Sequence, residues 1–88
     1  MDESFVAKLI DIGTELRLAA GQVVSSPEEP RSGVLLVLQG LLEVDGDERG
    51  AGHAIGLRER LDEVRVVART DVRLVAVDRA DWEAAETG

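Results

Sequence analysis

The sequence contains no cysteine, which excludes disulfide bonds, thiolate catalysis and metal sites built on cysteine. Aromatic residues are almost as scarce, since Phe5 and Trp82 are the only ones. A core must therefore be built from Val, Leu, Ile and Ala, and the chain offers no aromatic platform on which bases could stack. His53 is the single histidine, whereas a metal site of the cupin type needs several converging ligands. We therefore expect no metal site.

Positive charge is also in short supply: Lys8 is the one lysine, and the net charge is −8. Contacts to phosphate backbones need clustered Lys and Arg, so this balance disfavours a nucleic-acid partner. The longest apolar run, residues 33–38, is far too short to cross a bilayer, and no basic and apolar leader precedes it. We therefore expect a cytoplasmic protein with no membrane partner.

Apolar residues alternate with a period of two along most of the chain, which predicts short antiparallel strands. We expect one domain over residues 1–88, with a helix from about 4 to 12, a β-roll from about 14 to 78 and a short helix from about 79 to 86. Ser4 is expected to cap the first helix and Gly13 to end it. Glycines mark the turns between strands, and they are Gly21, Gly40, Gly52 and Gly56.

The run from Val34 to Leu38 is typical of a strand that is covered on both faces. We expect residues 39–40 to form a hairpin turn into the strand at residues 41–44. Strict alternation would give this region more apolar side chains than one interior face can take. We therefore predict an outward apolar patch that includes Leu35, Val37 or Leu41. A partner, a second copy or the terminal helices would cover it.

The two aromatic residues lie at opposite ends of the chain. Phe5 and Trp82 are expected to pack the terminal helices onto the roll. The alternative is that Trp82 is an exposed anchor for a partner.

The order and spacing of four segments, residues 20–24, 34–44, 52–56 and 66–82, resemble those of the cyclic nucleotide-binding domain. The resemblance covers nearly the whole chain. It implies a mainly β fold, namely an antiparallel double-stranded β-helix, or jelly roll, flanked by short N- and C-terminal helices.

The binding chemistry of that family is not matched. In the family, the glycine that corresponds to Gly56 is followed by a glutamate for the ribose, a short helix facing the cyclic phosphate, and an arginine that pairs with it. Here Leu57 stands at the glutamate position. Asp62 stands near the arginine position, where its carboxylate would repel phosphate. The loop is also a few residues shorter than usual.

Nearby arginines offer one way to restore a pocket, although they are more simply solvated charges among acidic neighbours. If a divergent pocket persists, its ligand-binding residues would be Gly56, Leu57, Arg58, Arg60 and Arg65.

We therefore favour a non-catalytic regulatory, docking or assembly module that has lost nucleotide binding and needs no cofactor. It would act through a protein partner or by self-association. The alternative is a divergent sensor of cyclic AMP or cyclic GMP within a larger regulatory protein. Ser25 and Ser26 lie in a proline-containing loop without a Gly-x-Ser-x-Gly context, so we expect no enzyme activity.

Overall fold

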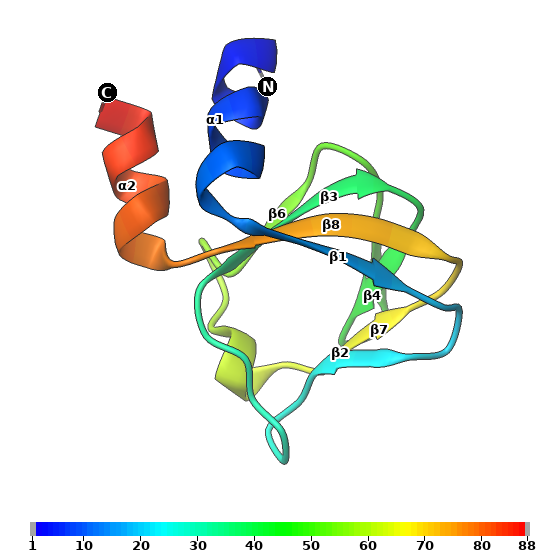
Figure 1. The fold of residues 1–88 in the computed structure, drawn as a ribbon. Helices are drawn as coiled ribbons and strands as arrows, with labels where there is room; N and C mark the ends of the chain where they lie inside the picture. Colours follow the sequence, from blue (N-terminus) through cyan, green and yellow to red (C-terminus); the bar gives the residue numbers. More distant parts are fainter. Residues whose placement is uncertain (1, 88) are drawn as a thin grey trace.

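A computed structural model, which describes residues 2–87, shows two four-stranded antiparallel sheets with a helix at each end of the chain (Figure 1). The mainly β roll with short flanking helices is thus confirmed. Residues 1 and 88, the ends of the expected domain, lie outside the described part. The elements are α1 (Glu3–Ile12), β1 (Thr14–Leu18), β2 (Val23–Ser25), β3 (Val34–Gln39), β4 (Leu42–Val44), β5 (Asp47–Arg49), β6 (Ala54–Ile55), the 3-10 turn η1 (Leu61–Glu63), β7 (Val66–Ala68), β8 (Val72–Val77) and α2 (Arg79–Thr87).

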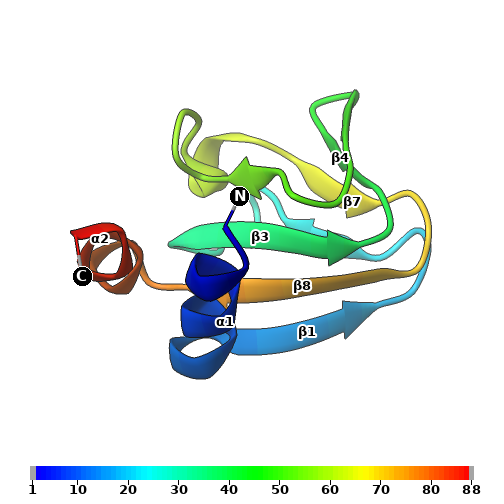
Figure 2. The same cartoon turned by 90° about the horizontal axis from the view of Figure 1, so that it is seen from above.

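Chain connections cross repeatedly between the two sheets. One sheet has the strand order β1-β8-β3-β6 and the other β2-β7-β4-β5, so β3 and β4 belong to different layers (Figure 2). The hairpin predicted at residues 39–40 is therefore wrong. The alternating pattern shows where strands lie, but it does not show which strands pair. A hairpin does join β4 to β5, where Asp45 and Gly46 have φ values of 47° and 90°.

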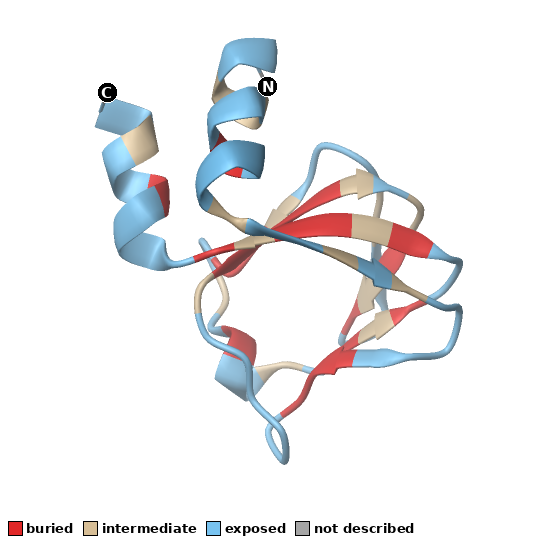
Figure 3. Ribbon diagram, in the orientation of Figure 1, coloured by how far each residue is buried: buried red, intermediate tan, exposed pale blue. Residues whose placement is uncertain are grey.

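Most of β3 is buried (Figure 3), and its apolar side chains are divided between two cores. Leu35 and Val37 are 0% and 1% exposed and lie in the cluster between the sheets. Val34 and Leu36 point the other way, into a second cluster beneath the helices. The prediction that Leu35 or Val37 faces outward is therefore wrong, because the alternation is offset by one residue. Leu41, the third candidate, is half-buried.

Both terminal helices contribute to this second cluster, on the outer face of the first sheet. Phe5 of α1 and Trp82 of α2 meet edge to face, with ring centroids 5.2 Å apart and an interplanar angle of 88°. Trp82 is 2% exposed, so it packs α2 onto the roll and offers almost no surface to a partner. The outward apolar residues of β3 are thus covered by the chain itself.

Asp2, rather than Ser4, caps α1, because its side chain accepts a hydrogen bond from the Ser4 amide at 3.0 Å. The helix ends at Gly13, whose amide donates to the Leu9 carbonyl at 2.8 Å. Neither α1 nor α2, the helices of residues 2–87, is long and apolar enough to cross a membrane.

Candidate functional site

The loop that joins β6 to β7 contains all the residues expected to bind a ligand. It begins at Gly56, which has φ 109°. A Cβ at this position would lie 2.5 Å from the carbonyl oxygen of Gly33, so glycine allows the end of β6 to approach the start of β3 closely. The loop then continues through η1 to β7.

Leu61 of η1 turns inward and is 3% exposed. It joins the interior cluster, which also contains Val24, Ile55 and Val66. Its carbonyl oxygen accepts a hydrogen bond from the hydroxyl of Ser25 at 3.1 Å. Within residues 2–87, the buried residues that are polar or charged are Ser25 and Ser26 alone. A sugar phosphate buried here would lose its hydration without gaining charged partners.

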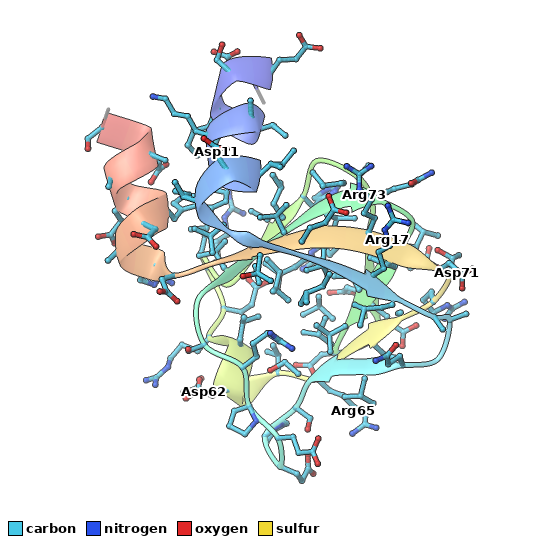
Figure 4. All side chains as sticks on the ribbon, in the orientation of Figure 1. Asp11, Arg17, Asp62, Arg65, Asp71 and Arg73 are labelled. Carbon is cyan, nitrogen blue, oxygen red and sulfur yellow. The ribbon has the colours of Figure 1, made fainter. Side chains whose placement is uncertain are left out.

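The predicted arginines do not converge on the interior of the roll. Arg60 donates from Nε and Nη2 to the two carboxylate oxygens of Asp62, at 3.2 and 3.1 Å, and its side chain is 71% exposed. Arg58 is exposed. Arg65 lies below β2, well away from Asp62 beside η1 (Figure 4). Leu57, at the position of the family's glutamate, is 40% exposed and lies at the surface.

A cleft of about 340 Å³ lies where the β2–β3 loop, η1 and the first turn of α2 meet. It brings together two of the five predicted ligand-binding residues, Gly56 and Arg60, and leaves out Leu57, Arg58 and Arg65. We name it the arginine cleft. The residues that matter to its chemistry are Arg31, Gly33, Gly56, Arg60, Asp62 and Arg79.

Two arginines of this cleft were missed by sequence reasoning. The guanidinium of Arg79 donates to the carbonyl oxygen of Gly56, and Nε of Arg31 lies 3.5 Å from the carbonyl oxygen of Val24. Both residues are distant from Gly56 in the sequence. The sequence shows only where each arginine stands relative to the expected loops and helices. Arg31 follows the proline-containing loop, and Arg79 begins the last helix.

The single histidine lies at the surface. His53 is exposed in a turn, with Nδ1 at 3.1 Å from the carbonyl oxygen of Gly50. Residues 2–87 include no group of three or more His, Cys, Asp or Glu side chains that could hold a metal ion.

Solved structures with the same architecture include bacterial regulators. The protein CLP of Xanthomonas campestris, described as a c-di-GMP responsive global regulator, has a TM-score of 0.77 and 16% identity, over 98% of this chain and 49% of that one. The catabolite activator protein of Thermus thermophilus has a TM-score of 0.71 and 21% identity, over 99% of this chain and 47% of that one. The chain has a cyclic nucleotide-binding-like fold. A protein of Brucella abortus described as cyclic nucleotide-binding-like has a TM-score of 0.71 and 14% identity, over 100% of this chain and 87% of that one.

These identities are low enough that the likeness concerns the fold alone. The chain also spans only about half the length of the two regulators. Neither models of protein families nor curated proteins give a match to this sequence.

Proposed function

We propose that this cyclic nucleotide-binding-like domain is a non-catalytic regulatory module that acts through protein contacts and does not bind cyclic AMP or cyclic GMP inside its roll. The observation that carries the proposal is the position of Leu61. Its side chain occupies the interior at the loop where the family resemblance would place the cyclic phosphate. An aliphatic side chain there removes both the space and the hydrogen-bond donors that a buried phosphate requires.

The charges of the loop support the same proposal. Asp62 and Glu63 both lie near the guanidinium of Arg60, at 3.1 and 3.8 Å. A phosphate that approached Arg60 would therefore compete with two carboxylates already present. No cofactor is required by the proposed function.

A regulatory role is supported by what solved proteins of this fold are described as doing. Besides CLP, they include a transcriptional regulator from Thermotoga maritima, with a TM-score of 0.73 and 21% identity over 96% of this chain and 74% of that one. The contacts of the proposed module cannot use Leu35, Val37 or Trp82, because all three are buried. Among residues 2–87, the large apolar side chains that stay exposed are Ile10, Ile12, Val23 and Leu57, and the first two lie on α1.

A calorimetric titration with cyclic AMP and cyclic GMP tests the proposal. We expect no site tighter than about 10 μM, and no rise in melting temperature at nucleotide concentrations that would saturate such a site. The doubly substituted chain, Leu57→Glu with Asp62→Arg, restores the two family side chains. It should also fail to bind, because Leu61 still fills the interior. A wild-type site tighter than the stated limit would favour the sensor function instead if the bound nucleotide also perturbs the interior residues Leu61 and Ile55.

A further inference from the structure

We propose that the arginine cleft is a binding site for a small oxyanion, the phosphate or carboxylate group of a ligand held outside the roll. The cleft lies among residues 30–33, η1 and the start of α2. This inference does not depend on the proposed function, because the interior of the roll and the cleft are different places. It concerns three guanidinium groups that come from three separate segments.

Within the described residues 2–87, two of these arginines have no carboxylate partner, although the chain is strongly acidic. The sequence has 18 Asp and Glu against 10 Lys and Arg. Arg31 and Arg79 nevertheless donate to main-chain carbonyl groups, and no Asp or Glu of residues 2–87 lies within 4.0 Å of either guanidinium. Arg69, which directly follows β7, shows the contrasting case, since its guanidinium lies 2.6 Å from the carboxylate of Glu43. The cleft therefore retains uncompensated positive charge, which favours an anion.

The third arginine already holds an oxyanion from within the chain. Arg60 donates two parallel hydrogen bonds to the carboxylate of Asp62. A guanidinium binds a carboxylate or a phosphate in this geometry. Asp62 also lines the cleft. The side chains of this pair are 71% and 44% exposed, so water screens their attraction. An external oxyanion that also binds Arg31 and Arg79 can therefore compete for Arg60 with Asp62, and with Glu63 at 3.8 Å.

Hydrogen bonds between the segments hold the cleft in place before any ligand arrives. The hydroxyl of Ser25, which is 1% exposed, accepts from the amide of Arg31 at 2.8 Å and donates to the carbonyl of Leu61 at 3.1 Å. These bonds fix the β2–β3 loop against η1. Arg79 ties α2 to Gly56 in the same way. A site assembled in advance loses less entropy when its ligand binds.

A larger cavity of about 730 Å³ at the opposite end of the first sheet is a weaker candidate. Its two arginines, Arg17 and Arg73, lie 3.6 and 3.2 Å from Glu15, so their charge is already partly neutralised. Arg17 lies far from Asp62 (Figure 4), which makes it a suitable control position.

The test is a nuclear magnetic resonance titration of the chain with inorganic phosphate at constant ionic strength, with succinate as the carboxylate probe and chloride as the control anion. We expect saturable shifts of the amides of residues 31–33, 56, 60–62 and 79–80. Arg31→Gln and Arg79→Gln should each weaken binding about tenfold, as loss of a charge-assisted hydrogen bond implies. Asp62→Asn should strengthen it about two- to fivefold by releasing Arg60. Arg17→Gln should leave the affinity unchanged.

Tighter binding of phosphate assigns the site to phosphate-bearing ligands, and tighter binding of succinate assigns it to carboxylates. Shifts that do not saturate, or that chloride reproduces, overturn the proposal. The proposal is also overturned if folded Arg31→Gln and Arg79→Gln variants bind the anion with the same affinity as the wild type. If Arg79→Gln unfolds, two variants at exposed side chains decide the question. Arg60→Gln should weaken anion binding, and Asp62→Asn should strengthen it.

Cyclic AMP separates this inference from the proposed function. Shifts confined to the cleft and weakened by Arg31→Gln would reflect its phosphate group, and they would leave the interior of the roll unoccupied. Shifts of the Leu61 and Ile55 methyl groups would contradict the proposed function without bearing on the cleft.

Discussion

Leu74→Ala is expected to lower the free energy of unfolding by about 2 to 5 kcal/mol, because the substitution leaves a cavity that the roll cannot refill. Leu74 is 0% exposed and lies in the interior cluster. Its strand, β8, is paired on both sides, with Leu16 of β1 and Val37 of β3 as neighbours in register. Strands held on both edges cannot move inward to close the space. Urea denaturation followed by circular dichroism measures the loss.

Leu36→Ala provides the matched comparison in the second core. Leu36 is 1% exposed and lies beneath the helices, which can shift more readily than a paired strand, so its cost should be at the lower end of the same range. Glu48→Gln, at an exposed position of β5, serves as the neutral control. An unchanged denaturation midpoint in Leu74→Ala would mean that the residue does not belong to the interior core.

The positions of strands and helices follow from the sequence far better than their pairing does. Both helices begin and end within one residue of the expected bounds, and β3 and β4 lie where strands are expected. The strands β5 and β6 and the turn η1 were not predicted. Alternation fails at β3 for a physical reason: both faces of this strand are buried, so Leu35 and Leu36 carry the same apolar signal. Only the helices on one side and the second sheet on the other distinguish the two faces.

Some features of the candidate site can be predicted from neighbouring residues in the sequence, whereas others depend on contacts between distant segments. Leu57 and Asp62 depart from the family pattern at positions that can be read directly along the chain. The inward turn of Leu61 depends on how tightly the shortened loop closes over the interior. The cleft depends on Arg31 and Arg79, which reach Gly56 and Arg60 only after the whole roll has formed. Contacts between distant segments leave no short pattern in the sequence.

Gly56→Ala is expected to lower the free energy of unfolding by about 2 to 5 kcal/mol. Part of this is the cost of an L side chain at positive φ, roughly 1 to 2 kcal/mol, and the remainder is overpacking, about 1 to 3 kcal/mol. The new Cβ would lie 2.5 Å from the carbonyl oxygen of Gly33 and 3.3 Å from Cα of Val34. Both are backbone atoms, so β3 or the loop must shift.

Gly52→Ala is the matched control for this prediction. Gly52 has φ 91°, close to that of Gly56, but a Cβ there would meet no atom within 4 Å. It should therefore show only the conformational part, roughly 1 to 2 kcal/mol. The difference between the two losses of unfolding free energy, measured by thermal denaturation, gives the contribution of the close approach of β6 to β3. This approach also positions the arginine cleft. Equal losses in the two variants would show that the loop can move away from Gly33 at no cost, and the cleft would then lack the fixed geometry on which its proposed affinity depends.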